Sequence, residues 1–297
     1  MEKTGLQVLL QDPAPAAKAG RLGLLYNQAS VGPDFGYAAD LISAAFPGRL
    51  KVLFGPQHGI WCTEQDNMRE TDHAVHPRLG LPVFSLYSST RRPFPAMLEE
   101  TDSVLVDIQD VGTRVYTFAA TVLYLMEECA KLGKEVWILD RPNPINGIDV
   151  EGNVLKPEFA SFVGPHPIPM RHGMTMGELM TFYNEVHAVG CRLRVVPMTG
   201  WHREFMFNST GLPWIMPSPN MPTPDTALVY PGQVILEGTN ISEGRGTTRP
   251  FEVFGAPFID PLEIIRRIEP GVCDGAILRP LEFRPTFNKW SGQVCKG

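Results

Sequence analysis

The sequence predicts an α/β protein, with a Rossmann-like, doubly wound parallel sheet and a second, smaller auxiliary domain of α+β type. Short apolar runs alternate with longer segments in which apolar residues recur every three or four positions. This alternation is typical of parallel strands joined by helical crossovers. After Met198 it stops, and residues 201–231 show little periodicity. We therefore place the Rossmann-like domain at residues 1–205 and the auxiliary domain at residues 206–297.

The predicted strands are short apolar runs, as expected of parallel strands that are buried on both faces. They are Leu22–Tyr26, Leu50–Phe54, Val83–Tyr87, Val104–Ile108, Val136–Leu139 and Leu193–Val196.

The predicted helices have apolar residues at helical spacing. They are Tyr37–Phe46, Thr117–Leu132, Met176–Val189 and, in the auxiliary domain, Pro261–Ile268. Thr175 and Glu178 have the spacing of a capping box, in which each side chain satisfies a free backbone N–H at the start of a helix.

Composition narrows the class of protein. Hydrophobic residues make up 43% of the 297 residues and charged residues 20%, which suits a globular chain with a sizeable core. The net charge of −6 and the absence of a basic run argue against nucleic-acid binding and against docking on an anionic membrane. The five cysteines are scattered without a C-x-x-C pair, and no leader or membrane-spanning segment is evident. We expect reduced thiols, a cytoplasmic location, no membrane insertion and no metal.

Polar residues follow four of the predicted strands, where an open α/β sheet binds its ligands. This pattern predicts a pocket for a small, highly hydroxylated substrate. The residues are Asn27, Gln57, His58, Asp107, Asp110, Arg114, Tyr116, Asp140, Arg141 and Asn143.

Four carboxyl groups are candidates for catalysis, because glycosidic cleavage usually needs two such groups beside one bond. They are Glu64, Glu70, Asp107 and Asp110. Asp107 lies inside a buried strand, so it equally suits a structural role, accepting backbone N–H groups or pairing with an arginine such as Arg114 or Arg141. For each acidic residue taken alone, the segment from Glu64 to Glu70 suits a solvated acidic loop better than a catalytic site.

Later polar loops extend the predicted pocket, because arginine and asparagine donate directional hydrogen bonds to hydroxyl and carboxylate groups. The alternative for the loop of residues 243–248 is a turn with a surface ion pair. The candidates are Arg171, His172, Asn220, Glu237, Asn240, Glu243 and Arg245.

Several familiar signatures are absent. The sequence contains no P-loop, no complete dinucleotide fingerprint, no G-x-S-x-G nucleophile elbow and no H-E-x-x-H zinc motif. The histidines have no metal-ligand spacing, and His58 and His172 suit hydrogen bonding in a pocket better than metal binding.

Long motifs resemble the bacterial exo-β-N-acetylmuramidase family. They are LFGPQHGI (53–60), DIQDVGTRVYT (107–117), LDRPNPING (139–147), SFVG (161–164), IPMRHGMTMGEL (168–179), PSPNMPT (217–223) and YPGQVILEGTNISEGRGTTRPFEVFGAP (230–257). The resemblance implies a Rossmann-like domain with an auxiliary domain and the site in the cleft between them. It implies release of N-acetylmuramic acid from the non-reducing end of peptidoglycan fragments, in cell-wall recycling. It implies no cofactor, and it leaves export open.

The resemblance also implies residue roles. One of Arg171, Arg245 or Arg114 would pair with the lactyl carboxylate of the sugar. Asp140, Asn143, Asn220 and Asn240 would hold its hydroxyl and acetamido groups.

Gln57 departs from the family motif, which reads G-P-E-H-G and implies a glutamate as general acid at that position. A glutamine cannot donate the catalytic proton. Either Glu64, Glu70 or Asp110 has this role, or the chain is a sugar-binding member of the fold without catalysis, or it is a hydrolase of another class. Family members are usually longer at the C-terminus, so we expect an incomplete auxiliary domain. The sequence sets no oligomeric state.

Overall fold

A computed structural model describes residues 2–66 and 69–297. The chain divides into two compact units, Met1–Pro219 and Asn220–Gly297. Residues 206–219, which the sequence prediction gave to the auxiliary domain, belong to the first unit.

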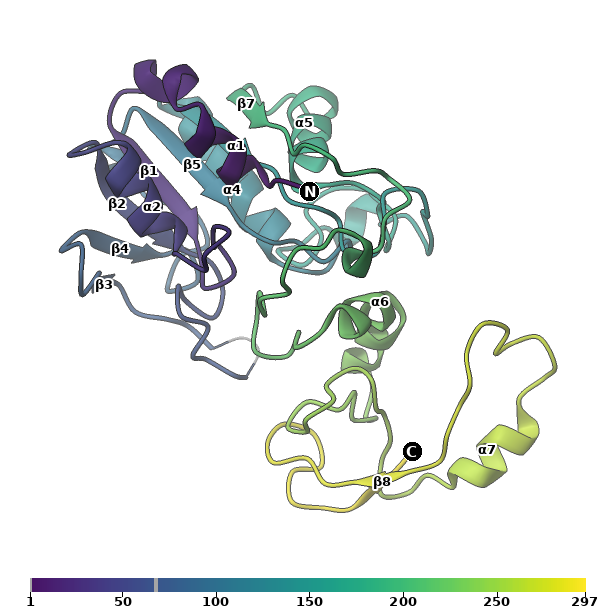
Figure 1. Cartoon of the computed structure of the whole chain (residues 1–297). Coiled ribbons are helices and arrows are strands. Elements are labelled where there is room, and N and C mark those ends of the chain that lie inside the picture. The colour runs from purple at the N-terminus through teal and green to yellow at the C-terminus, as the bar shows by residue number, and fades with distance from the viewer. Residues whose placement is uncertain (1, 67–68) are drawn as a thin grey trace. The chain divides into compact units, whose positions relative to one another are not determined.

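The first unit is built on a seven-stranded sheet of order β3-β4-β2-β1-β5-β6-β7 (Figure 1). All neighbouring strands are parallel except β3 and β4, which are antiparallel. The predicted Rossmann-like sheet is confirmed, with an added antiparallel edge. Its strands are β1 (Leu22–Tyr26), β2 (Leu50–Gly55), β3 (Ala74–Val75), β4 (Pro82–Ser85), β5 (Ser103–Asp107), β6 (Glu135–Leu139) and β7 (Arg192–Val196).

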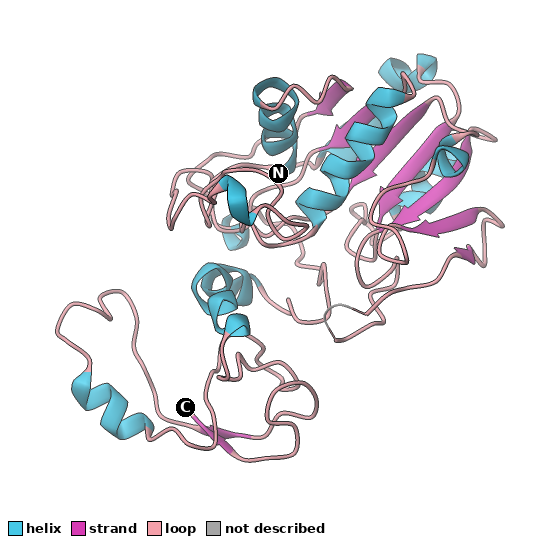
Figure 2. Cartoon of the chain, turned by 180° about the vertical axis from the view of Figure 1, so that it is seen from behind, coloured by secondary structure: helices cyan, strands magenta, loops and turns pink. Residues whose placement is uncertain are grey.

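Helices cover both faces of this sheet, as doubly wound folds require. Helices α1 and α2 pack on one face, and α4 and α5 pack on the other (Figures 1 and 2). The helical segments are α1 (Gly5–Gln11), η1 (Ala14–Lys18), α2 (Ala38–Ala45), α3 (Pro95–Leu98), α4 (Phe118–Lys131), η2 (Pro157–Phe159), α5 (Met176–Val186) and η3 (Phe207–Ser209).

Local sequence explains where α5 begins. The Thr175 hydroxyl accepts a hydrogen bond from the Glu178 N–H, and the Glu178 carboxylate accepts one from the Thr175 N–H. The predicted capping box is therefore confirmed. Thr4 and Gln7 form a second capping box at α1, a helix that the periodicity did not predict.

Burial differs between the centre and the edge of the sheet. Every residue of β1 and β5 is buried, so these runs contain almost only apolar residues. The prediction that the last strand is buried on both faces was wrong. β7 is an edge strand, and its residues Arg192 and Arg194 are exposed.

The strand order creates a topological switch point between β1 and β5. From β1 the chain crosses to β2 on one side, and it later returns to β5 on the other side, where Tyr26 pairs with Asp107. In open α/β sheets, ligands bind outside the carboxyl ends of the strands at such a point. The fold therefore brings the residues after β1 and β5 to the expected ligand position.

The second unit contains short elements joined by long loops. Pro224 stands in the first turn of α6, where a missing N–H costs nothing, and the Thr223 side chain caps this helix. The sequence did not predict α6, because Pro231 lies inside it. The helix predicted at 261–268 is present as α7. The elements are α6 (Pro224–Gln233), η4 (Val234–Gly238), α7 (Pro261–Arg267), β8 (Glu282–Phe283) and β9 (Cys295–Lys296).

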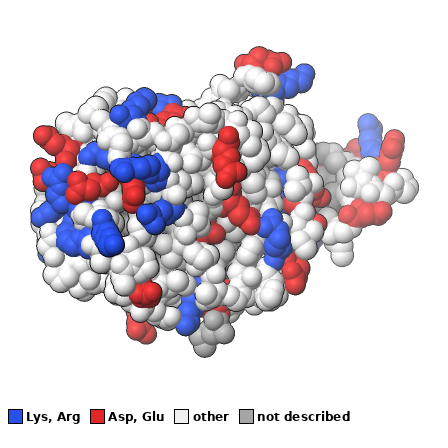
Figure 3. Space-filling model, turned by 90° about the horizontal axis from the view of Figure 1, so that it is seen from above, with Lys and Arg blue, Asp and Glu red and all other residues white. Residues whose placement is uncertain are grey.

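Within residues 2–66 and 69–297, every helix is too short or too polar to cross a lipid bilayer. On the face shown in Figure 3, Lys and Arg side chains lie among Asp and Glu side chains.

Candidate functional site

Loops that follow β1, β5 and β6 converge at the carboxyl edge of the sheet. The Ser30 hydroxyl donates to the carbonyl of Asp107, and Arg141 Nη2 donates to the carbonyl of Val31 at 3.3 Å. Asn27 Nδ2 donates to the carbonyl of Pro217 at 2.8 Å, which brings a distant segment to the same edge. These contacts join the ends of three neighbouring strands.

Asp107 and Arg141 form a buried ion pair at this edge. Arg141 Nε lies 2.6 Å from Asp107 Oδ1, and Nη2 lies 2.9 Å from Oδ2. Two parallel bonds of this kind match the planar fork of the guanidinium to the carboxylate. Both carboxylate oxygens of Asp107 are occupied, and these contacts match the structural alternative for this residue.

Asp110 and His172 form a second buried pair. Asp110 Oδ2 accepts a bond from the Gly112 N–H at 2.7 Å and lies 3.3 Å from His172 Nε2. The Met174 N–H donates to His172 Nδ1 at 3.2 Å, and His172 Nε2 has no hydrogen-bond partner among the described residues. Asp110 Oδ1 is buried and has no hydrogen-bond partner among the described residues. The pair ties the loop after β5 to the segment before α5.

Asp140 connects β6 to α5. Its Oδ1 accepts from the Gly177 and Arg141 N–H groups at 2.8 and 3.1 Å, and its Oδ2 accepts from the Thr175 hydroxyl at 2.8 Å. Burial raises the pKa of Asp140 to about 6, and these hydrogen bonds offset part of the rise. Asn143 has a similar role in its loop, accepting from the Ile145 N–H and donating to the carbonyl of Met174. Asp140 and Asn143 therefore form their hydrogen bonds with other groups of the protein.

The loop after β2 is tightly turned, with His58 and Gly59 at φ of +71° and +74°. Gln57 Oε1 accepts a hydrogen bond from the Thr117 hydroxyl at 2.7 Å, and Thr117 is the residue that precedes α4. His58 Nδ1 lies 2.6 Å from the carbonyl oxygen of Glu64. The loop is therefore fixed to α4 on one side and holds the backbone of Glu64 on the other.

Glu64 and Glu70 line an open cavity at the ends of β2 and β4. We name it the acidic cavity; its volume is about 260 Å³. The Glu64 side chain is 33% exposed and lies 3.7 Å from Arg69, and that of Glu70 is 57% exposed and lies 3.4 Å from Arg91. Trp61 forms part of the wall and is 36% exposed. This cavity presents carboxylates to solvent beside an aromatic ring.

Two candidate arginines of the first unit are held by other groups. Arg114 Nη1 donates to the carbonyl oxygens of Asn153 and Ile168 at 2.7 and 2.6 Å, and burial lowers the pKa of its guanidinium. Arg171 pairs with Glu151 at 2.8 Å and with Asp149 at 3.1 Å. Tyr116, also a candidate, packs its ring 4.7 Å from that of Phe118.

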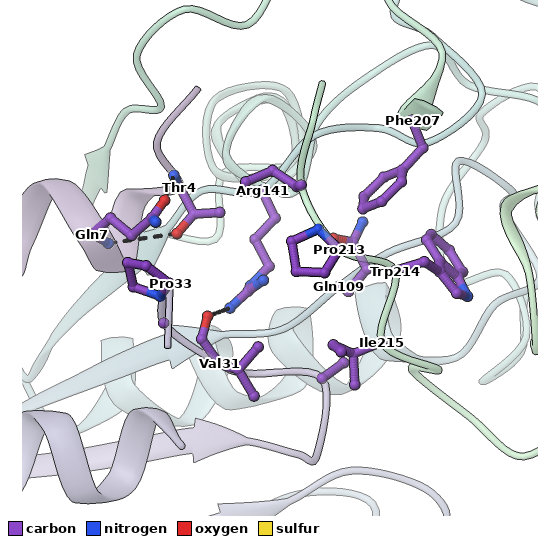
Figure 4. A pocket seen from close by; sticks show the side chains of 13 residues that line it. Thr4, Gln7, Val31, Pro33, Gln109, Arg141, Phe207, Pro213, Trp214 and Ile215 are labelled. Carbon is purple, nitrogen blue, oxygen red and sulfur yellow. Dashed lines mark hydrogen bonds between the residues drawn. The ribbon is translucent and has the colours of Figure 1, made fainter. Parts of the chain in front are cut away.

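A second cavity lies at the switch point between β1 and β5 (Figure 4). We name it the switch-point pocket; its volume is about 30 Å³, about the volume of one water molecule in the liquid. Figure 4 shows Arg141 reaching between Val31 and Pro213, with Gln109 and Trp214 beside it. The lining residues are Thr4, Gln7, Ala29, Val31, Gly32, Pro33, Gln109, Arg141, Phe207, Leu212, Pro213, Trp214 and Ile215.

The candidate residues of the second unit form a buried ion-pair network. Arg245 lies 2.6 Å from Glu237 and 3.4 Å from Glu243, and Lys289 lies 3.0 Å from Glu243. These contacts match the ion-pair alternative for this loop, although Glu243 is buried rather than on the surface.

The two asparagines of that unit differ in burial, since Asn240 is exposed and Asn220 is buried. The backbone carbonyl of Asn240 accepts a bond from the Trp290 indole at 2.7 Å. The Asn220 side chain is buried.

Sequence reasoning missed both tryptophans of these cavities. Trp61 follows the loop after β2, and Trp214 stands in a segment that showed no periodicity. An aromatic residue just beyond a strand end was the available signal for Trp61, while nothing local indicated Trp214.

Within the described ranges, no three His, Cys, Asp or Glu side chains are grouped to hold a metal ion.

Comparison with known proteins places this geometry in a family. The profile of the exo-beta-N-acetylmuramidase NamZ N-terminal domain matches residues 22–225, and that of the NamZ C-terminal domain matches residues 228–297. The chain belongs to the NamZ family. The peptidoglycan beta-N-acetylmuramidase NamZ of Bacillus subtilis (strain 168) is 43% identical over 295 residues, which are 99% of this chain and 71% of that protein.

Two solved structures are also similar to this chain, and both are DUF1343 family proteins from Bacteroides fragilis NCTC 9343. The first has a TM-score of 0.89 and 36% identity, over 100% of this chain and 76% of the other. The second has a TM-score of 0.79 and 28% identity, over 99% of this chain and 75% of the other. The NamZ family thus shares the fold described here.

Proposed function

We propose that this chain is a glycoside hydrolase that releases N-acetylmuramic acid from the non-reducing end of peptidoglycan-derived saccharides. The observation that carries the proposal is the 43% identity, over nearly the whole chain, to a peptidoglycan beta-N-acetylmuramidase. The convergence of polar loops at the carboxyl edge of the sheet supports it, since this is where the fold class binds small ligands.

Glu64 is the proposed general acid. Asp107 has both oxygens bound to Arg141, and the Asp110 side chain is only 5% exposed. A general acid must come within hydrogen-bond reach of the glycosidic oxygen, which favours a carboxyl group that lines an open cavity. The backbone of Glu64 is also held by His58, so its place beside β2 is fixed.

Glu70 is the proposed second carboxyl group, because it lines the same cavity. The cavity of about 260 Å³ has room for a saccharide unit, and Trp61 offers an apolar ring face at its wall. Gln57, buried against Thr117, is proposed to position the loop that carries His58.

The remaining candidate residues are proposed to shape the binding site rather than to carry out the reaction. Asp140 and Asn143 shape the loops around the substrate, and Arg114 and Arg171 order the neighbouring segments. Roles for the candidates of the second unit rest on the family resemblance alone.

A saccharide is the proposed partner, with no role for nucleic acid. A cytoplasmic location is also proposed, on the pattern of five scattered cysteines.

A chromogenic 4-nitrophenyl β-glycoside of N-acetylmuramic acid tests the activity, with the N-acetylglucosamine glycoside as the matched control substrate. We expect nitrophenol release from the first substrate. A folded protein that releases none, yet binds the sugar in calorimetry, would instead be a sugar-binding member of the fold. Hydrolysis of a nitrophenyl ester alone would indicate a hydrolase of another class.

A further inference from the structure

The lining of the acidic cavity does not by itself suit an anionic sugar. Three carboxyl groups line it, those of Glu64, Glu70 and Asp72. N-Acetylmuramic acid differs from N-acetylglucosamine by a lactyl group, which ends in a carboxylate. Like charges repel at short range, so a cavity of this kind that accepts the muramic sugar needs a cation beside it.

Two arginines contact carboxylates that line the acidic cavity. Arg69 Nη1 lies 3.7 Å from Glu64, and the Arg69 side chain is 69% exposed. Arg91 Nη1 lies 3.4 Å from Glu70, and the Arg91 side chain is only 26% exposed. A side chain that is already ordered loses less conformational freedom when it binds a ligand, which favours Arg91 as the cation.

The guanidinium of Arg91 is fixed by its neighbours. Its Cζ atom lies 3.7 Å from the centroid of the Tyr87 ring and 5.9 Å from that of Phe162, and Nη1 donates to the carbonyl of Ser88. Guanidinium groups are attracted to aromatic faces at such distances. Tyr87 is fully buried, and its ring lies 5.8 Å from that of Phe162. Arg91 is therefore oriented before any ligand binds.

The backbone of Tyr87 is bonded to the wall of the acidic cavity. Its N–H donates to the Ser85 hydroxyl at 3.0 Å, and its carbonyl accepts from the Thr71 N–H at 2.9 Å. Ser85 and Thr71 both line the cavity, as does Glu70. Arg91 thus rests on a residue that is attached to the wall and contacts a carboxylate of the wall, which places its guanidinium at the rim.

The pairing with Glu70 leaves Arg91 able to bind a second carboxylate. The Glu70 side chain is 57% exposed, and exposed ion pairs of this kind are weak. A guanidinium has five N–H donors, and the contacts with Glu70 and Ser88 use those of Nη1. Donors therefore remain for the two-pronged pairing that matches a guanidinium to a carboxylate.

We propose that Arg91 pairs with the lactyl carboxylate and makes the enzyme select N-acetylmuramic acid over N-acetylglucosamine. This inference rests on the proposed function. Two arginines that the sequence suggested for this role are bound to other groups of the first unit. Arg114 donates to two backbone carbonyls, and Arg171 pairs with Asp149 and Glu151.

The 4-nitrophenyl β-glycosides of N-acetylmuramic acid and N-acetylglucosamine test the role of Arg91. In Arg91→Gln, kcat/KM for the muramic substrate should fall about 10–100-fold, the usual effect of losing hydrogen bonds to a charged group. For the glucosamine substrate it should change by less than about threefold. The lactyl methyl ester of the muramic substrate should react slowly with the wild type, and Arg91→Gln should not slow it further, because the interaction is then already absent.

Arg91→Lys is a second variant, which keeps the charge but lacks the planar fork, so it should show a smaller loss for the muramic substrate alone. It also serves if Arg91→Gln fails to fold. Arg92→Gln is the matched control. Arg92 also lies over a tyrosine ring, that of Tyr124 at 3.9 Å, and pairs with Glu128, but both partners are on α4. This control should keep the wild-type ratio of the two substrates.

Three outcomes with an active wild type would overturn the role of Arg91 and leave the proposed function intact. In the first, Arg91→Gln keeps the wild-type ratio. In the second, it slows both substrates equally, so that Arg91 acts through Glu70. In the third, Arg69→Gln loses the selectivity instead.

If the folded wild type cleaves neither glycoside, the proposed function fails, and calorimetry tests Arg91 separately. N-Acetylmuramic acid and its lactyl methyl ester are the two ligands. Arg91→Gln should weaken binding of the acid about 10–100-fold and leave binding of the ester unchanged. Equal affinities of the wild type and Arg91→Gln for the acid would overturn the inference.

Discussion

The carboxyl edge of the sheet has two contrasting regions. At the ends of β1, β5 and β6, the polar side chains are buried and mostly bound to one another, as in the pairs Asp107–Arg141 and Asp110–His172. At the ends of β2 and β4, the carboxylates of Glu64 and Glu70 are partly exposed around a cavity. Similar polar residues therefore have two roles. Side chains whose hydrogen bonds are made within the protein fix the loops, whereas side chains that face a cavity are available to a substrate.

The largest expected effect is on turnover in the acidic cavity. Glu64→Gln keeps the shape of the side chain but removes the proton, so kcat should fall by about 10²–10⁴-fold, the usual contribution of a general acid. Saccharide affinity in calorimetry should stay within a few-fold. Glu99→Gln, an exposed glutamate after α3, is the control. Wild-type turnover in Glu64→Gln would move the role to another carboxyl group, and Asp110→Asn is then the next variant.

In the buried region, substitutions should lower the free energy of unfolding rather than turnover. Arg141→Met leaves Asp107 buried without its partner, and breaking such a pair typically costs about 3–5 kcal/mol. Urea unfolding followed by near-ultraviolet circular dichroism measures the loss. Asp102→Asn breaks the exposed Arg21–Asp102 pair and should cost much less. Equal losses in the two variants would contradict the contrast between buried and exposed pairs.

A pH dependence should follow from Asp140. Because burial raises its pKa from an ordinary 3.8 to about 6, the folded state binds the proton more tightly than the unfolded chain. The protonated Asp140 carboxyl therefore makes its full contribution to the free energy of unfolding below pH 4. This contribution is lost as the pH rises through about 6, and the loss amounts to about 3 kcal/mol. Asp140→Asn removes this titration, so its stability relative to the wild type should rise between pH 4 and pH 6. A stability difference independent of pH would exclude the raised pKa.

The smallest expected effect is at Gln57. Gln57→Glu retains an acceptor for the Thr117 hydroxyl, so the fold should tolerate it. If Glu64 supplies the proton, kcat should change by less than about threefold. An increase of 100-fold or more would instead locate the acid position at residue 57, and a matched Gln65→Glu variant would show that an added carboxylate alone has no such effect.

The sequence predicted much of the sheet, and the reason is physical. Central strands such as β1 and β5 are buried on both faces, so most of their residues are apolar and visible as runs. β3, β8 and β9 have two residues each, too few for any periodicity. In α6 an internal proline hid a helix whose first turn is capped by Thr223.

The candidate site was predicted less completely, because pairing depends on contacts between distant segments. Asp107 had a choice of arginine partners in the sequence, and only the packed sheet selects Arg141. The contact between Asn27 and Pro217 joins residues 190 positions apart, so no local pattern announces it. The rule that ligands bind at the carboxyl ends of strands was enough to predict the edge of the sheet. Glu64 and Asp107 differ in the exposure of their side chains, and this difference is visible only in the folded structure.

The most direct test of the central claim is digestion of a disaccharide with N-acetylmuramic acid as its non-reducing unit, followed by chromatography and mass spectrometry. From the wild type we expect equal amounts of free N-acetylmuramic acid and the released second sugar. Recovery of the intact disaccharide from folded, sugar-binding protein would contradict it.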